Sequence, residues 1–158
     1  MKKRPVRYAL LLIAVVWMAL IFGFSAQSAT ESGGLSAIIT KPLTNFIASF
    51  AYDMSPAQML ALYMRVDGAV RIAAHFCEYA VLGMLLTAVL RAFGIKNALW
   101  PWLVGLAYAV TDEWHQSYSP GRANEPKDVL IDAAGVLCGV AIYHIIRKIW
   151  RRFHVHHS

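Results

Sequence analysis

The chain has 158 residues, of which 58% are hydrophobic and 15% are charged, and its mean hydropathy is +0.49. This composition is too apolar for a soluble domain of this size and is typical of a small polytopic membrane protein. The formal net charge is +6, but the basic residues cluster beside apolar segments. They therefore indicate anionic lipid head groups as partners, and no nucleic acid.

Four apolar segments are long enough to cross the roughly 30 Å hydrocarbon core of a membrane as helices. They cover residues 8–24, 72–93, 99–116 and 129–150, and the last turn of the third is polar. No internal repeat or domain boundary interrupts the chain. Residues 1–158 are therefore predicted to form a single domain, an all-α polytopic helical bundle with four transmembrane helices and an amphipathic outer segment.

The first span has a second interpretation as a secretory signal peptide. Lys2-Lys3-Arg4 precedes the apolar run and Ala26-Gln27-Ser28 follows it, as basic and small residues do in such signals. The apolar run is about 17 residues long, which exceeds a usual signal core. Its length favours a retained membrane helix.

The segment between the first two spans is predicted to be helical as well. Apolar residues recur at helical spacing from Leu35 to Phe50, and Pro42 is expected to kink or break this amphipathic helix. The helix is expected either to lie on the outer membrane surface or to pad the loop against the bundle. Ser55-Pro56-Ala57-Gln58 then predicts a capping box that starts a short helix through Met64.

The positions of the basic residues predict the topology. They gather before the first span, between the second and third, and after the fourth, which the positive-inside rule assigns to the cytoplasm. These residues are Lys2, Lys3, Arg4, Arg7, Arg91, Lys96, Arg147, Lys148, Arg151 and Arg152. We therefore expect a multi-pass protein of the cytoplasmic membrane with both termini cytoplasmic, so that segments 25–71 and 117–128 face outward.

Three of the spans carry a stripe that is polar at its outer end and continues as small residues toward mid-membrane. The stripes are Arg71, His75, Glu78, Tyr79 and Gly83; Gly105, Ala109, Asp112, Glu113 and Gln116; and Asp128, Asp132, Gly135 and Gly139. Because small residues let membrane helices approach closely, we expect the stripes to face one another. Their polar ends are then predicted to converge in one outward-opening pocket.

This pocket is expected to be negatively charged. Six acidic side chains fall in or beside it against three basic ones, a net charge of −3 before any histidine is protonated. They are Glu78, Asp112, Glu113, Glu125, Asp128 and Asp132, with Arg71, Arg122 and Lys127. Carboxylates near a low-dielectric interface must pair, protonate or bind a cation.

The first two interpretations of the pocket are a structural polar network and the site of a metal-dependent enzyme. In the first, Arg71, Arg122 and a protonated His75 neutralise the acids and tie the helices together. In the second, a divalent metal ion polarises a phosphoryl or carbonyl group of a lipid-linked substrate, as in a membrane hydrolase or transferase. The candidate metal ligands are His75, Glu78, Glu113 and Asp128, with Asp112 as a further candidate catalytic residue. No specific metal-binding motif is present, so the sequence does not decide whether the protein is an enzyme.

A third interpretation is a binding site without chemistry. Arg71, Gln116, Arg122 and Asp132 would then hold a lipid head group, a peptide or another lipophilic ligand. Tyr118-Ser119-Pro120-Gly121-Arg122 predicts a type II turn, which would return Arg122 over the outer end of the third span. The neighbouring His115 is expected to be an interfacial or solvated histidine.

In sequence these motifs resemble those of VanZ-like membrane proteins. The resemblance covers essentially the whole chain and rests on Phe24-Ser25-Ala26-Gln27-Ser28, His75, Glu78-Tyr79, Leu82-Gly83, Asp112-Glu113-x-His115-Gln116, Pro120-Gly121-Arg122, Asp128 and Gly135-x-x-x-Gly139. It implies a four-helix integral membrane protein of the bacterial envelope. The namesake of this family is associated with reduced susceptibility to the lipoglycopeptide antibiotic teicoplanin. The resemblance therefore implies a lipid, cell-wall or lipoglycopeptide-related ligand, but neither a reaction nor an oligomeric state. Asp132 stands where many relatives carry Asn, which adds a negative charge here.

Overall fold

The computed structural model describes residues 3–51, 53–119 and 126–155, which are almost entirely helical. Five helices follow in chain order: α1 (Lys3–Ser25), α2 (Ala29–Ala48), α3 (Pro56–Ala92), α4 (Leu99–Gln116) and α5 (Pro126–Val155). No strand occurs within the described ranges. The all-α prediction is therefore confirmed.

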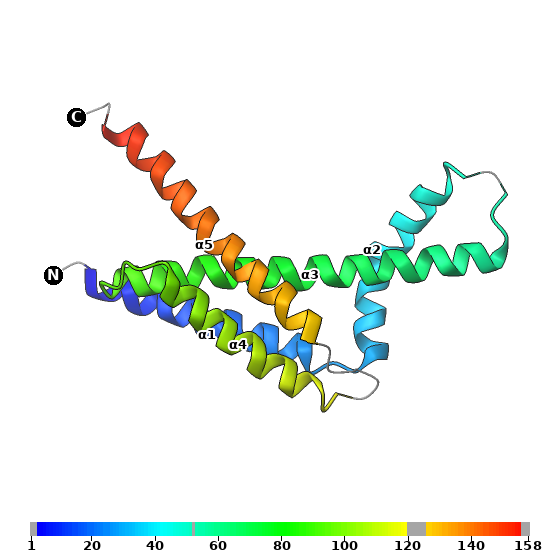
Figure 1. Cartoon of the computed structure of the whole chain (residues 1–158), viewed down its shortest axis with the longest axis horizontal. Coiled ribbons are helices and arrows are strands. Elements are labelled where there is room, and N and C mark those ends of the chain that lie inside the picture. The colour runs from blue at the N-terminus through cyan, green and yellow to red at the C-terminus, as the bar shows by residue number, and fades with distance from the viewer. Residues whose placement is uncertain (1–2, 52, 120–125, 156–158) are drawn as a thin grey trace.

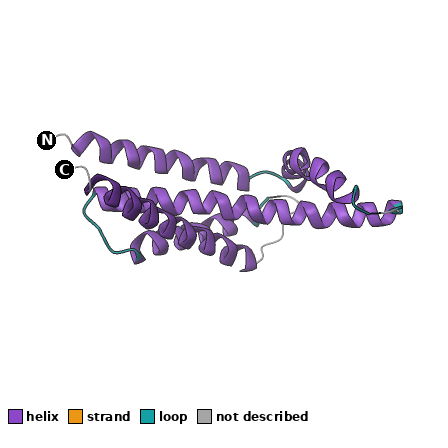
Figure 2. Ribbon diagram, turned by 90° about the horizontal axis from the view of Figure 1, so that it is seen from above, coloured by secondary structure: helices purple, strands orange, loops and turns teal. Residues whose placement is uncertain are grey.

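The long helix α3 is the axis of the molecule and contacts each of the other four helices. Helix α5 crosses it, and α1 and α4 both run below α3 in the view of Figure 1. Both views place the two ends of the chain at the same end of the bundle (Figures 1 and 2). The opposite end, where α1 and α4 finish and α5 begins, is called the distal end below.

Three described helices are long and apolar enough to cross a membrane: Arg4–Ser25, Pro56–Ala92 and Pro126–Phe153. The chain is thus a multi-pass membrane protein. Helix α4 matches the expected third span in its bounds, but it is not among these three, because Asp112, Glu113 and Gln116 make its last turn polar. The prediction of four transmembrane helices is not confirmed.

Helix α3 differs from the sequence expectation of a short helix ending at Met64 and a separate span over 72–93. Ser55 caps its N-terminus through the predicted capping box with Gln58, and the helix then runs unbroken for 37 residues. The Asp67 carboxylate pairs with the Arg71 guanidinium one turn later at 2.9 Å, which supports the helix where the sequence suggested a break. At about 1.5 Å per residue, α3 is longer than the membrane core is thick.

Helix α2 confirms that the segment between the first two predicted spans is helical. It starts at a capping box formed by Ser28 and Glu31. The Ser28 hydroxyl donates to the Glu31 carboxylate and lowers the pKa of that carboxyl below its usual range. Pro42 lies inside the helix, which bends along its course (Figure 1). The buried face of α2 carries Thr40 and Thr44, whereas its large apolar side chains point outward. Such a surface suits a lipid environment.

Glycines bring α3, α4 and α5 into close contact, as the stripes of small residues predicted. A Cβ atom at Gly83 would collide with the backbone of Val136, and one at Gly139 would collide with the carbonyl of Ala80. A Cβ at Gly105 would lie 2.6 Å from the side chain of Val136. Backbone contacts of this closeness require glycine. They hold the three helices together in the middle of the bundle, away from the distal end.

Candidate functional site

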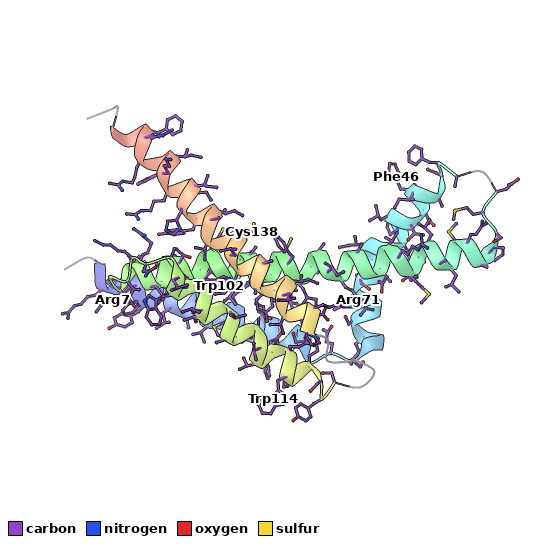
Figure 3. All side chains as sticks on the ribbon, viewed as in Figure 1. Arg7, Phe46, Arg71, Trp102, Trp114 and Cys138 are labelled. Carbon is purple, nitrogen blue, oxygen red and sulfur yellow. The ribbon has the colours of Figure 1, made fainter. Side chains whose placement is uncertain are left out.

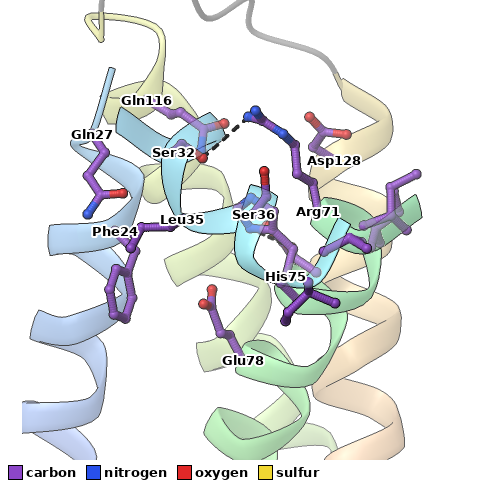
Figure 4. A pocket seen from close by; sticks show the side chains of 16 residues that line it. Phe24, Gln27, Ser32, Leu35, Ser36, Arg71, His75, Glu78, Gln116 and Asp128 are labelled. Carbon is purple, nitrogen blue, oxygen red and sulfur yellow. Dashed lines mark hydrogen bonds and ion pairs between the residues drawn. The ribbon is translucent and has the colours of Figure 1, made fainter. Parts of the chain in front are cut away.

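A cavity of about 380 Å³ opens at the distal end between the end of α1, the first half of α2, the middle of α3 and the start of α5 (Figure 4). Six predicted site residues line it, namely Arg71, His75, Glu78, Gln116, Asp128 and Asp132. The structure thus places these six side chains around one cavity, and its role as a functional site stays a prediction. Arg122, together with the predicted turn through Pro120 and Gly121, lies outside the described residues.

The remaining two site candidates, Asp112 and Glu113, are buried in the last turn of α4 and do not line the cavity. Asp112 is 2% exposed, and its Oδ2 atom accepts hydrogen bonds from the Ser25 hydroxyl at 2.6 Å and the Tyr79 hydroxyl at 3.1 Å. These bonds join α4 to α1 and α3. Asp112 therefore belongs to a network that fixes three helices behind the cavity.

Helix α1 is anchored to this bundle by further hydrogen bonds. The Trp17 indole donates to the Glu78 carbonyl at 3.0 Å, and the Tyr108 hydroxyl donates to the Met18 carbonyl at 2.6 Å. The Ser119 hydroxyl donates to the carbonyls of Ser25 and Ala26 at 3.3 Å each. Because each bond satisfies a polar group within the bundle, α1 is an integral part of the site.

Arg71 does not neutralise the pocket acids in the way the sequence suggested. Its Nε atom donates to Asp67, and its Nη1 atom donates to the Ser32 hydroxyl at 3.3 Å. Asp67 also accepts from Ser36 at 2.6 Å and from Thr40 at 3.1 Å. Much of the charge of Arg71 is thereby engaged by Asp67, which the charge balance drawn from the sequence left out. This cluster fastens α2 to α3 and forms one wall of the cavity.

Asp132 is the most deeply buried carboxylate that faces the cavity, at 3% exposure. The His75 imidazole lies opposite it, with Nδ1 3.9 Å from Oδ1 of Asp132. That separation is too long for a hydrogen bond. Oδ1 of Asp132 and Oδ1 of Asp112 have no hydrogen-bond partner within the described part of the chain. Of these two atoms only Oδ1 of Asp132 belongs to a residue that lines the cavity, so Asp132 retains acceptor capacity there.

The described residues provide no ready-made metal centre. No three of their His, Cys, Asp or Glu side chains form a group that could hold a metal ion. The four candidate ligands His75, Glu78, Glu113 and Asp128 are therefore not gathered around one point, and a metal at this site stays a prediction.

The other wall of the cavity is apolar and open to the surroundings. Phe24, Leu35, Ile39 and Ile72 line it, and each is also between 47% and 60% exposed. Figure 4 shows Phe24 and Leu35 on the side of the cavity away from Arg71 and Asp128. The cavity thus joins a carboxylate-rich end to an apolar exit, a combination that suits an amphiphilic ligand.

Sequence reasoning missed the contribution of α2 to this site. Ser32, Ser36 and Leu35 come from a segment that was expected only to lie on the membrane or pad the loop. The Ser28 and Glu31 capping box was a readable signal for the start of this helix. His115, expected to be an interfacial or solvated histidine, stacks on Phe22 of α1 with ring centroids 3.8 Å apart.

Comparison with known proteins gives one result. A family model described as VanZ/LLP1 matches residues 10–147, which is most of the chain and includes every described residue of the cavity wall. No curated protein and no solved structure matches the chain.

Proposed function

Since this chain belongs to the VanZ/LLP1 family, we propose that it is an envelope membrane protein that binds an amphiphilic lipid or lipid-linked cell-wall compound in the cavity at its distal end. The observation that carries the proposal is the two-sided cavity. Its carboxylates and Gln116 would hold a polar head group, and the exposed apolar side chains of Phe24 and Leu35 would contact an acyl or polyprenyl chain.

We further propose that all four helices α1, α3, α4 and α5 cross the cytoplasmic membrane, with both termini in the cytoplasm and the cavity facing outward. The common end of the two termini supports an even number of crossings (Figures 1 and 2). The buried polar groups of α4 support its inclusion, because its last turn directs them into the bundle rather than toward lipid. The basic residues near the termini support the orientation.

Cysteine labelling in intact cells tests this orientation. Ser119 is buried and is a poor site, whereas the adjacent Tyr118 is 73% exposed. In a background without Cys77 and Cys138, an impermeant maleimide is expected to modify Tyr118→Cys in intact cells. Lys96→Cys, at the opposite end of the bundle, should react only after permeabilisation. The reverse pattern would show that the cavity faces the cytoplasm.

Blocking the cavity tests the binding proposal. Ala74 lines the cavity, and Ala73 is exposed on the same helix outside it. Ala74→Phe is expected to reduce the amount of co-purifying lipid by about tenfold, which corresponds to about 1.4 kcal/mol of binding free energy. Mass spectrometry of lipids extracted from the purified protein measures this loss. Ala73→Phe is the matched control and should retain the lipid. Equal lipid content in both variants at equal protein abundance would contradict the proposal.

A further inference from the structure

The polar side chains that line the cavity indicate which kind of head group its ligand carries. Resting on the function proposed above, we propose that the head group selected by this protein carries a protonated primary amine next to a phosphate. The ammonium group binds at Asp132, and the phosphate binds at Arg71. The ligand class is therefore a phospholipid of the phosphoethanolamine type.

The Oδ1 atom of Asp132 is an acceptor that an ammonium group can fill. The Asp132 side chain is 4% exposed and lines the cavity, and its Oδ1 atom lacks a hydrogen bond within the described residues. A buried polar atom without a partner is destabilising. An ammonium group supplies up to three N–H donors together with a compensating charge.

The charges around Asp132 favour a cation. Glu78 and Asp128 also line the cavity, and Asp112 and Glu113 are buried in the neighbouring turn of α4. Arg71 is the one described arginine or lysine in the cavity wall, and it forms its ion pair with Asp67. His75 faces Asp132 from α3 without a hydrogen bond to it. A cationic group would therefore be attracted into the cavity more strongly than a neutral one.

The shape of the cavity favours an organic amine over an inorganic ion. Its apolar wall and outward opening offer nothing to a bare cation, and the described residues do not form a metal-binding group. A primary amine also differs from a quaternary ammonium, which has no N–H to donate to Oδ1 of Asp132.

Arg71 provides the complementary site for a phosphate. Two of its nitrogens donate to Asp67 and Ser32, while Nη2 makes no hydrogen bond within the described residues. Figure 4 shows the guanidinium at the rim, between Ser32 and Asp128. Arginine is well suited to bind phosphate through its planar fork. Asp128 and Asp132 are one helical turn apart, about 6 Å along α5. A phosphate at the rim would thus leave an adjacent ammonium directed toward Asp132.

Titration of defined short-chain lipids into the full-length protein in detergent tests this inference. Dioctanoyl phosphatidylethanolamine is expected to bind about tenfold tighter than the phosphatidylglycerol and phosphatidylcholine analogues, as isothermal titration calorimetry would measure. Asp132→Asn should reduce this preference to within about twofold, and Asp128→Asn, at a less buried position, should weaken it. Asp53→Asn removes an exposed carboxylate outside the cavity and should preserve it.

The outcomes distinguish a failure of the head-group inference from a failure of the proposed lipid-binding function. If the three lipids bind wild type equally, or if Asp132→Asn keeps the preference for the amine, the head-group inference is wrong and the lipid-binding function stands. If none of the lipids binds, both are wrong. If glycerophosphoethanolamine without acyl chains binds as tightly as the lipid, the amine site stands, but the apolar exit has no role and the proposed function is wrong.

Discussion

Replacing Gly139 with alanine is expected to destabilise the bundle more than any other single methyl group added to a glycine of the described helices. The added Cβ would collide with the carbonyl of Ala80 on α3, and a backbone atom cannot rotate away as a side chain can. Overpacking of this kind costs about 1–3 kcal/mol. We therefore expect a lower melting temperature in detergent and a lower abundance in the membrane, measured by fluorescence-detected size-exclusion chromatography after heating.

Gly68→Ala is the matched control for this variant. Gly68 lies within α3, and a Cβ there meets no atom within 4 Å. Because alanine favours helix over glycine by about 1 kcal/mol, Gly68→Ala should maintain or raise the stability. If Gly139→Ala and Gly68→Ala melt at the same temperature, the close contact between α3 and α5 does not exist as described.

Replacing Asp112 with alanine is expected to have the second largest effect. Ser25 and Tyr79 both donate to Oδ2 of Asp112 and are themselves buried. Without the carboxylate these two hydroxyl groups lose their acceptor, at a cost of about 1–3 kcal/mol each in a water-soluble protein. Interhelical hydrogen bonds in membranes contribute less, about 0.6 kcal/mol on average. We therefore expect the free energy of unfolding to fall by about 2 kcal/mol in total. This loss is observed as a lower melting temperature in detergent.

Asp112→Asn removes the negative charge but keeps an oxygen that can accept hydrogen bonds. The amide oxygen of asparagine can accept both hydroxyl groups, so this variant should keep most of the stability. The double variant Ser25→Ala, Tyr79→Phe should make the later loss of Asp112 much less costly, because no donor is left without an acceptor. If Asp112→Ala is as stable as wild type, these hydrogen bonds do not hold α1, α3 and α4 together.

Local sequence patterns predicted the helices and the contacts between their small-residue faces. The bounds of α4 and the close approach at Gly83 and Gly139 both followed from spacing along one helix. The capping box at Ser55 was also correct. These features depend on residues three or four positions apart, which a sequence displays directly.

The structural features that the sequence did not predict depend on contacts between residues far apart in the chain. The polar face of α3 near Asp67 resembles a loop in the sequence, but Ser36 and Thr40 of α2 cover it and allow a continuous helix. The bond between Ser25 and Asp112 joins residues 87 positions apart, which no periodicity reveals. The pairing of Arg71 with Asp67, in contrast, was readable from the spacing of four residues.

The proposed function requires that the cavity holds the head group of a lipid whose chain leaves between Phe24 and Leu35. An experimental structure of the protein in a bilayer made from its native lipids tests this most directly. We expect elongated density that begins within hydrogen-bond distance of Asp132 and Arg71 and continues past the apolar wall into the membrane. A cavity filled by the protein's own side chains, or occupied by water alone, would contradict it.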